Sequence, residues 1–496
     1  MEHTSSESSA RLSLRDTAIL ITVAVIGAGI YLVVSARTYR VGFPLDDSWI
    51  HLTYARNLAL SGEWAFQPGR LSAGSTAPLW TFLLAIGFWL HLGPYIWTYL
   101  MGEIVLLGLA LLCESAARKL TPSYRPRFPW IGAFFVAEWH FQWAALSGME
   151  TLLQGLVMTA VLVSLMLGTR RYLMLGLLSG LSMWIRPDGL TLLGPVILTI
   201  VLVEKTLADK GSALATYLIG FAALVVPYLA FNLWLSGAPL PNTFYAKQAE
   251  YAAWQLEPLL YRLSVLLVQL LTGPSVLLFP GMVAAAILAV RRRVWAMAAA
   301  LVWSGGYLLL YILRLPAYQH GRYLMPAMPI LFLVGLLAYV EFQKSRLFGR
   351  WHRTVQAVGQ LSLVVLTAAF VFLGARSYGQ DVGLIESEMV VTAKWVAASL
   401  PPHAVIAAHD IGALGYFDHH PLIDLAGLVS PEVIPFIRDE ARLAIFLDRH
   451  HANYLVAFPA FYPTLSRASE PIFTSGGPFA PEIGEKNMTV YLWRQP

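Results

Sequence analysis

Long apolar runs recur along the first three quarters of this chain, and they limit the folds that it can adopt. Each run approaches the roughly 20 residues that an α-helix needs to cross a bilayer. Of the 496 residues, 57% are hydrophobic and only 13% are charged, whereas soluble domains average about 45–50% and about 25%. The sequence therefore predicts an α-helical polytopic membrane protein with about 11–12 membrane helices. The runs lie at 17–34, 74–92, 97–117, 129–146, 150–168, 172–185, 188–204, 213–236, 274–290, 295–313, 325–342 and 355–374.

Basic residues orient these helices, because short cytoplasmic loops carry an excess of Lys and Arg. Topology therefore explains the net charge of +5 better than a nucleic-acid partner does. Two segments, at 119–127 and 254–271, break the expected alternation, so one or more runs should lie along the membrane interface instead of crossing. The basic groups assigned to the inside are Arg11 and Arg15, Arg170-Arg171, Lys205 to Lys210, Arg291 to Arg293, and Lys344 to Arg353.

The composition changes near residue 377, which predicts two domains. Residues 1–376 would form the membrane domain, with an outer loop over 37–73. Residues 377–496 would form a small α/β domain on the extracytoplasmic side, with a helix over 386–400. Strand-like runs follow at 405–408, 454–458 and 488–493, and Asp424 ends another short strand. The single cysteine, Cys113, lies in an apolar run, so no intramolecular disulfide can form.

The outer loop holds the most informative motif, an adjacent pair of carboxylates at Asp46 and Asp47. They precede a short helix that Gly62 is expected to end and that could lie on the membrane surface. One interpretation is structural, with either carboxylate capping this helix. In the other, one carboxylate is a general base that takes a proton from an acceptor hydroxyl. The second would then orient the acceptor or bind a divalent cation.

Cations close to the membrane are the second group of candidates. Arg314, His320 and Arg322 cluster near the expected outer surface, where the positive-inside rule does not call for them. A guanidinium group can bind phosphate there through two parallel hydrogen bonds. Arg186 fits either this role or simple snorkelling at the interface. Lys247 ends the expected outer loop 239–247. This loop is either a rigid turn anchored at the interface by its aromatic residues, or a segment that contacts the sugar while Lys247 binds the phosphate.

Two further motifs leave a structural and a functional interpretation open. Ser147 and Glu150 fit a capping box at a helix start, or Glu150 faces a polar cavity. The stretch 409–416 follows a predicted strand and is expected to form a tight strand-to-helix turn. Nearby residues look like metal ligands, although such spacing is poor evidence for a metal site. They are His409, Asp418, His419 and His420.

Taken in order, these motifs resemble the glycosyltransferase C superfamily, and more closely the branch that includes the mycobacterial terminal arabinofuranosyltransferases. The chain departs from the commonest pattern at Ser48, where an aromatic residue or Ala often stands, and at Asp188, where Glu is usual. These departures affect the identity of the sugar and not the class. The matching landmarks are Asp46-Asp47 with Tyr54-Ala55-Arg56-Asn57, Gly148 to Thr151, Arg186 to Gly189, Pro241 to Lys247, Arg322-Tyr323, and Asp410 to Tyr416.

The resemblance implies a membrane glycosyltransferase that moves a sugar, for example arabinofuranose, from a polyprenyl-phosphate donor to a glycan, lipid or protein of the cell envelope. Asp46 or Asp47 would be the base, and a single base without a covalent intermediate predicts inversion. The residues expected to bind the donor phosphate are Arg322, His320, Lys247 and Arg186. Those expected to contact the sugar or the acceptor are Tyr54, Arg56, Glu150, Asn242, Tyr245 and Asp410. No cofactor follows with certainty, and a divalent cation stays open.

The alternatives are a relative in the same superfamily with another acceptor, and a transporter or flippase of lipid-linked sugars without transfer chemistry. A transporter predicts ionisable residues along the helices at mid-membrane. The chain has few of these, mainly Glu103, Glu114, Glu138 and His140. The notable charges instead lie in the expected outer loops, which favours surface chemistry.

Overall fold

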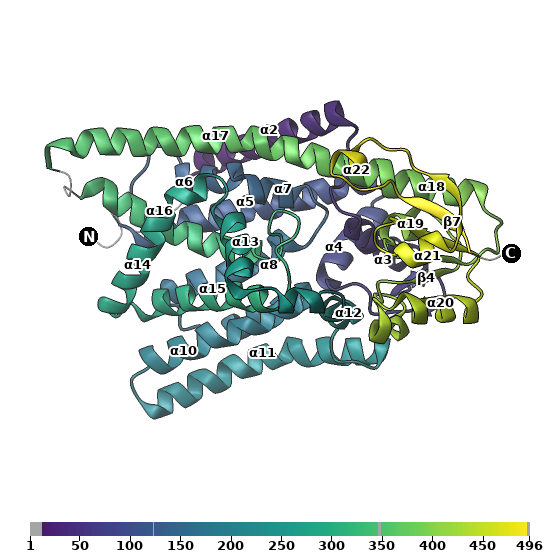
Figure 1. Ribbon diagram of the computed structural model, residues 1–496. Coiled ribbons are helices and arrows are strands. Elements are labelled where there is room, and N and C mark those ends of the chain that lie inside the picture. Colours follow the sequence, from purple (N-terminus) through teal and green to yellow (C-terminus); the bar gives the residue numbers. More distant parts are fainter. Residues whose placement is uncertain (1–11, 123, 346–348, 494–496) are drawn as a thin grey trace.

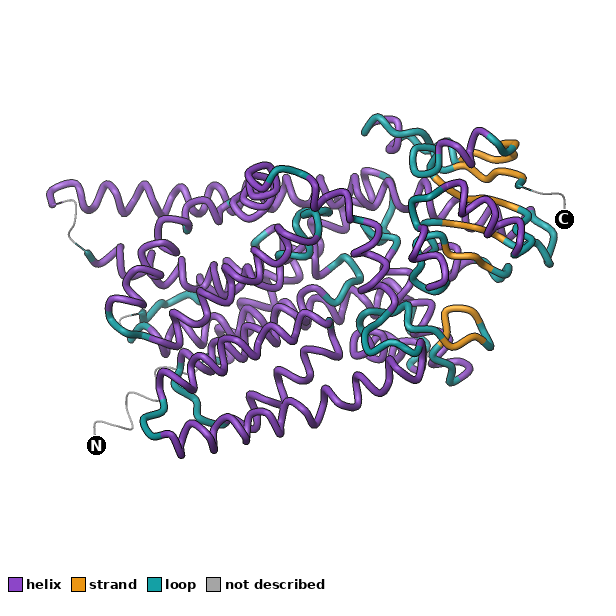
Figure 2. Tube along the Cα trace, turned by 60° about the horizontal axis from the view of Figure 1, so that its bottom comes forward, coloured by secondary structure: helices purple, strands orange, loops and turns teal. Residues whose placement is uncertain are grey.

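The computed structural model describes residues 12–122, 124–345 and 349–493; Arg11 and part of the basic stretch after Lys344 lie outside them. Long helices run side by side in a bundle that ends against a small sheet (Figures 1 and 2). The helices of the bundle and its loops are α2 (Leu14–Thr38), α3 (Asp47–Ser61), α4 (Pro78–Trp89), α5 (Pro94–Leu120), α6 (Trp130–Ala137), α7 (Trp139–Ala145), α8 (Thr151–Met166), α9 (Tyr172–Ile185), α10 (Leu193–Val203), α11 (Leu207–Ser236), α12 (Asn242–Glu250), α13 (Leu259–Leu271), α14 (Phe279–Arg291), α15 (Trp295–Arg314), α16 (Met328–Lys344) and α17 (His352–Ile385).

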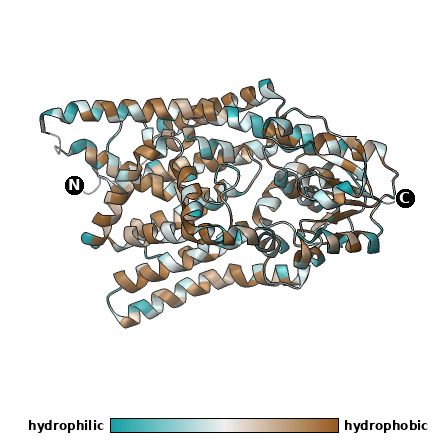
Figure 3. Cartoon of the chain, viewed as in Figure 1, coloured by the Kyte–Doolittle hydropathy of each residue, from teal (hydrophilic) through white to brown (hydrophobic). Residues whose placement is uncertain are grey.

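The bundle has the surface of a membrane domain. Among the described residues, six helices are long and apolar enough to cross a membrane, and six shorter apolar helices accompany them. Their outward faces expose large apolar side chains, such as Ile219 and Val226 on α11 and Leu361, Val364 and Phe372 on α17. Figure 3 shows these hydrophobic faces on the outside of the bundle. Because extended apolar faces are costly in water, the polytopic helical fold predicted from the sequence is confirmed.

Helix α4 explains the first break in the expected alternation. It has 12 residues, so at 1.5 Å per residue it is about 18 Å long and does not cross the roughly 30 Å apolar layer. Helix α5 therefore returns to the end of the bundle at which α2 begins. There Arg118 forms a 3.0 Å ion pair with Asp16 of α2. The prediction that the run 74–92 crosses the membrane is wrong, because its helix is too short.

The second break, at 254–271, arises because α13 and α14 lie one after the other along the bundle axis and together count as a single traverse. Arg262, near the start of α13, donates to the carbonyl oxygens of Ile312 and Leu313 at the end of α15. The end of α14 is joined directly to the start of α15. Together α13 and α14 therefore traverse the length of α15 once, in two pieces.

The run 129–146 also differs from the single helix expected there. It is divided at Glu138 into α6 and α7. The Glu138 carboxylate accepts the backbone N–H groups of His140 and Phe141. A carboxylate that caps a helix in this way stabilises a break inside an otherwise apolar segment.

The basic loops gather at one end of the bundle, which we call the basic end. The loops between α8 and α9 and between α10 and α11 meet there, and Arg170 contacts Glu204 at 3.2 Å. The connections from α14 to α15 and from α16 towards α17 lie at the same end (Figure 1). The opposite end carries the C-terminal sheet, and we call it the sheet end.

The C-terminal part is an α/β unit, as predicted. Its five-stranded sheet has the order β4-β3-β5-β7-β6, with β3, β4 and β5 parallel to one another and β7 antiparallel to both of its neighbours. Helix α17 continues through the expected boundary at 376–377 and ends at Ile385. The elements are α18 (Val391–Ser399), β3 (Ile406–Ala408), α19 (Gly412–Phe417), β4 (Leu422–Asp424), α20 (Glu440–Arg449), β5 (Tyr454–Ala457), α21 (Pro463–Arg467), β6 (Glu470–Thr474), α22 (Phe479–Glu482) and β7 (Thr489–Leu492).

Helix α3 connects the bundle to this sheet. On α3, the ring of Trp49 packs against those of Tyr416 and Phe417 on α19, with both ring centroids 4.7 Å away. Arg56 donates to the backbone oxygens of Gly415 and Tyr416. Helix α3 is therefore buried between α4 and α19, and the expectation that it lies on the membrane surface is wrong. This packing holds the acidic loop against the C-terminal unit.

Candidate active site

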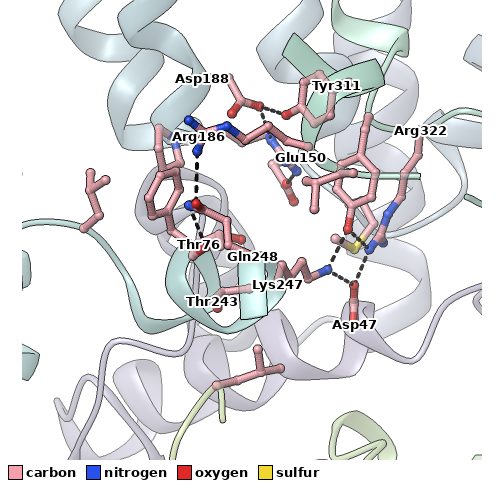
Figure 4. Close-up of a pocket in the computed structure, with 18 of the residues that line it drawn as sticks. Asp47, Thr76, Glu150, Arg186, Asp188, Thr243, Lys247, Gln248, Tyr311 and Arg322 are labelled. Carbon is pink, nitrogen blue, oxygen red and sulfur yellow. Dashed lines mark hydrogen bonds and ion pairs between the residues drawn. The ribbon is translucent and has the colours of Figure 1, made fainter. Parts of the chain in front are cut away.

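A cavity of about 320 Å³ opens at the sheet end. Residues of α3, α9, α12 and α15 line it, together with the start of α8 and the loop before α16 (Figure 4). Part of its wall is apolar, with Ile50, Leu240, Phe244 and Leu310 among the contributors. The polar and charged lining residues are Asp47, His51, Thr76, Glu150, Arg186, Asp188, Thr191, Thr243, Lys247, Gln248, Tyr311, Arg314, Arg322 and Tyr323.

The two adjacent carboxylates point in different directions. Asp46 is buried, and its two oxygens accept the backbone N–H groups of Gly412 and Ala413, at 2.6 and 2.8 Å. It thus caps α19 of the C-terminal unit. Neither Asp46 nor Asp47 caps α3 through its side chain, so the capping interpretation is wrong for that helix. Asp47 instead faces the cavity, where its side chain keeps 32% of its surface exposed.

Asp47 faces two cations across the cavity. Its Oδ2 lies 2.6 Å from Nη2 of Arg322 and 3.6 Å from Nζ of Lys247. Both cations also donate to the hydroxyl oxygen of Tyr323, at 3.1 and 2.7 Å. Figure 4 shows the side chains of Asp47, Lys247 and Arg322 converging from α3, α12 and the loop before α16. The group carries one more positive than negative charge, which suits a bound anion.

The charges of this group stabilise one another. Burial raises the pKa of Asp47, but the positive charges of Lys247 and Arg322 outweigh it and hold this pKa well below its usual range. The same two cations lower the pKa of Tyr323 in spite of its burial. By contrast, burial and the nearby Asp410 carboxyl raise the pKa of Asp46 to about 7, although two backbone N–H donors oppose the rise.

Two hydrogen-bond donors of Arg322 are unsatisfied. The residue is 4% exposed, and its buried Nε and Nη1 atoms have no hydrogen-bond partner among the residues that the structure describes. Buried guanidinium N–H groups normally find an acceptor, because leaving them unpaired costs free energy. Since Arg322 lines the cavity, its guanidinium group is a candidate to bind an anionic ligand there.

A second polar group lines another wall of the cavity. Glu150 is fully buried and accepts from Arg186 at 2.7 Å, and Arg186 also contacts Asp188 at 3.0 Å. Tyr311 donates to Asp188, and His51 lies 3.3 Å from Glu150. Glu150 makes no side-chain cap at α8. The predicted capping box is therefore wrong. Glu150 instead lines the cavity, beside Arg186.

The predicted phosphate ligands divide into two sets. Arg322, Lys247 and Arg186 line the cavity. His320 is not a lining residue; its Nε2 lies 2.7 Å from Oδ2 of Asp381 on α17.

Of the predicted sugar or acceptor contacts, only Glu150 lines the cavity. Tyr54 bonds to Ser72 and to the backbone N–H of Gly74. Asn242 donates to the backbone oxygen of Leu428. The remaining three lie outside the cavity lining: Arg56 contacts α19, Tyr245 lies half-buried on α12, and Asp410 lies beneath Asp46.

Some lining residues were not predicted from the sequence. Tyr311 and His51 lie inside helices, where an aromatic or imidazole ring is as easily a core residue. Tyr323 was noted only as part of an Arg-Tyr landmark. The charge of Arg322 beside it was the one signal that could have suggested its position. In the part of the chain that the structure describes, no three His, Cys, Asp or Glu side chains are grouped to hold a metal ion.

Comparisons with known proteins found similarities in sequence and in fold. A family model described as a domain of unknown function (DUF8728) matches residues 380–491. The terminal beta-(1->2)-arabinofuranosyltransferase of Mycobacterium tuberculosis (strain ATCC 25618 / H37Rv) is 28% identical over an alignment of 424 residues, which covers 75% of this chain. The chain spans 64% of the length of that relative.

Solved structures share the fold over almost the whole chain. ArnT from Cupriavidus metallidurans bound to undecaprenyl phosphate has a TM-score of 0.59 at 17% identity, and covers 96% of this chain and 98% of its own. The oligosaccharyltransferase of Archaeoglobus fulgidus, in complex with zinc and sulfate, has a TM-score of 0.56 at 13% identity, with 88% and 68% covered. The chain therefore has the glycosyltransferase C fold and resembles a terminal arabinofuranosyltransferase in sequence.

Proposed function

We propose that this protein is a membrane glycosyltransferase that takes a sugar from a polyprenyl-phosphate donor and transfers it to an acceptor of the cell envelope. The observation that carries the proposal is the group formed by Asp47, Arg322 and Lys247 in the cavity. It brings a carboxylate that can accept a proton within 4 Å of two cations that can bind a phosphate. Two buried N–H donors of Arg322 have no other partner.

The cations would bind the phosphate of the donor. The guanidinium group of Arg322 can donate to phosphate oxygens, and the ammonium group of Lys247 adds a second positive charge. The apolar wall of the cavity, which includes Leu240, Phe244 and Leu310, suits the first isoprene units of the lipid. ArnT, which shares the fold, has been solved with undecaprenyl phosphate. This likeness supports a lipid phosphate as the ligand.

Asp47 would be the general base. The acceptor hydroxyl loses its proton to the Asp47 carboxylate while its oxygen attacks the anomeric carbon of the sugar. The bond from that carbon to the phosphate oxygen breaks, and polyprenyl phosphate leaves with its negative charge stabilised by Arg322 and Lys247. A single displacement inverts the anomeric centre. Asp47 is bonded to both cations. A donor phosphate would share these cations and leave Asp47 a stronger base.

Asp46 would have a different task. Both of its oxygens are bonded to the start of α19, and it does not line the cavity, so it cannot reach the hydroxyl group of an acceptor there. Its role is to fix the loop that carries Asp47 against the C-terminal unit. The adjacent carboxylates therefore divide into a catalytic residue and a positioning residue.

The cavity would face the extracytoplasmic side. The loops rich in Arg and Lys lie at the basic end, whereas the cavity and the sheet lie at the other, and cytoplasmic loops carry the excess of positive charge. Nucleotide sugars are not supplied on the outer side, so a lipid-linked donor suits this orientation. The similarity to a terminal arabinofuranosyltransferase supports arabinofuranose as the sugar and an envelope glycan as the acceptor.

Binding of farnesyl phosphate, a short polyprenyl phosphate, to the detergent-solubilised protein tests the proposal. Arg322→Gln should weaken this binding by about tenfold or more, because a hydrogen bond to a charged group contributes about 1.5–3 kcal/mol. Arg262→Gln is the matched control, since Arg262 bonds only to backbone oxygens outside the cavity. Equal binding by wild-type protein and Arg322→Gln, or equal binding of neutral farnesol, would contradict the proposal.

A further inference from the structure

The turn that precedes Arg322 has an unusual backbone. Gln319, His320 and Gly321 have φ values of +52°, +58° and +70°. Residues with a Cβ pay roughly 1–2 kcal/mol to adopt the left-handed conformation. Two such residues in succession need a compensating interaction nearby. Backbone strain of this kind is found where a functional group must be aimed.

The side chain of His320 supplies such an interaction. Its Nε2 atom lies 2.7 Å from Oδ2 of Asp381, and the same oxygen accepts the indole N–H of Trp143 at 2.9 Å. The imidazole ring packs edge-on against the rings of Trp139 and Trp143, at 5.4 and 5.2 Å between centroids. The turn is therefore fastened to α17 through Asp381 and to α7 through the two indole rings.

Arg322 belongs to the same turn. Its backbone N–H donates to the carbonyl oxygens of Tyr318 and Gln319. A change of φ at Gln319 or His320 would rotate the peptide that leads into Arg322 and move its guanidinium group. Nη2 of that group lies 2.6 Å from Oδ2 of Asp47, and its other two nitrogens are unsatisfied. A small rotation of the turn would therefore misalign the guanidinium group for a phosphate.

We propose that His320 and Asp381 are positioning residues that hold the left-handed turn 319–321 and thereby aim Arg322 at the donor phosphate. The inference rests on the proposed function, because it assigns a purpose to Arg322. It also replaces direct phosphate binding by His320, which lies outside the cavity lining. The pair acts through the backbone of the turn and not through contact with the ligand.

The test is binding of farnesyl phosphate to the full-length protein in detergent. His320→Ala and Asp381→Ala should each reduce affinity by about tenfold, since each removes a hydrogen bond to a charged group. Adding Gln319→Gly to Asp381→Ala should restore about threefold, because glycine adopts a positive φ without cost. Gln319→Ala in the same background should restore nothing. A purely structural role would not distinguish glycine from alanine here.

His420→Ala is the matched control. His420 also pairs with an aspartate, Asp418, at 2.6 Å, but neither residue lines the cavity. Wild-type affinity in both His320→Ala and Asp381→Ala would overturn the inference, as would an equal loss in His420→Ala or no recovery with Gln319→Gly. If wild-type protein does not bind farnesyl phosphate, or binding does not depend on Arg322, the proposed function itself fails. Monodisperse elution of each variant confirms folding.

Discussion

At the scale of single residues, neighbouring aspartates in one motif differ because of what surrounds each. Asp47 keeps its charge because two cations face it, whereas Asp46 is buried against the start of α19 beside Asp410. Sequence spacing could not separate them, since adjacent residues at a helix start point in directions that only the tertiary fold fixes. The partner of Asp46, the backbone of Gly412 and Ala413, is 366 residues away.

The buried state of Asp46 predicts a pH dependence of stability. Its pKa rises from 3.8 to about 7 on folding, so between about pH 4 and pH 7 the folded protein binds a proton that the unfolded chain releases. Stability from this group is therefore present at low pH and lost as pH rises towards 7. Asp46→Asn should flatten this part of the profile, measured as melting temperature in detergent from pH 5 to pH 8. An unchanged difference between pH 5 and pH 7 in the variant would contradict the assignment.

At the scale of elements, the contact between α3 and α19 determines where Asp47 lies in the cavity. Gly412 lies so close to the acidic loop that an added Cβ would come within 2.0 Å of the backbone oxygen of Asp46. No side chain fits in this space unless one of the two elements moves. The position of Asp47 is thereby tied to the C-terminal unit.

Gly412→Ala should therefore destabilise the protein by about 1–3 kcal/mol, the usual cost of overpacking, and should also reduce transfer activity. The melting temperature in detergent measures the first effect. Gly211→Ala on α11 is the control, because nothing lies within 4 Å of a Cβ added there. If Gly412→Ala melts with the wild-type protein, the close contact between α3 and α19 is not as described.

Some helices and strands were predictable from the sequence, and others were not. Apolar period and length predicted the long helices, and the strand-like runs predicted β3, β4, β5 and β7. Strand β6 was not predicted, because its residues are mostly exposed and because it contains Pro471 at the edge of the sheet. The break at Glu138 and the short length of α4 were not predicted either. Hydropathy alone does not show where a helix ends inside an apolar run, or whether that helix crosses the membrane. Asp47, Arg322, Lys247 and Arg186 were found by their charge, whereas their pairing needed the fold.

At the scale of the whole molecule, the account depends on the two ends of the bundle facing opposite sides of the membrane. The chain suits a labelling test because its single cysteine, Cys113, is buried. In a Cys113→Ser background, Lys486→Cys in the C-terminal unit should react with a membrane-impermeant maleimide on intact cells. Arg292→Cys at the basic end should react only after the cells are permeabilised. The reverse pattern would place the cavity on the cytoplasmic side. Both positions are exposed on the protein.

The most direct test of the central claim separates binding from transfer in Asp47→Asn. The variant should bind farnesyl phosphate at least as tightly as wild-type protein, because a carboxylate that shares Arg322 and Lys247 has been removed. Transfer from a polyprenyl-phosphate pentofuranose to an envelope fraction should fall by about 10²–10⁴, the usual contribution of a general base. Asp46→Asn keeps one of the two oxygens that accept from α19, so it should lose far less of the transfer rate than Asp47→Asn. Near-normal transfer by Asp47→Asn, or a loss of transfer that merely follows a loss of binding, would contradict the account.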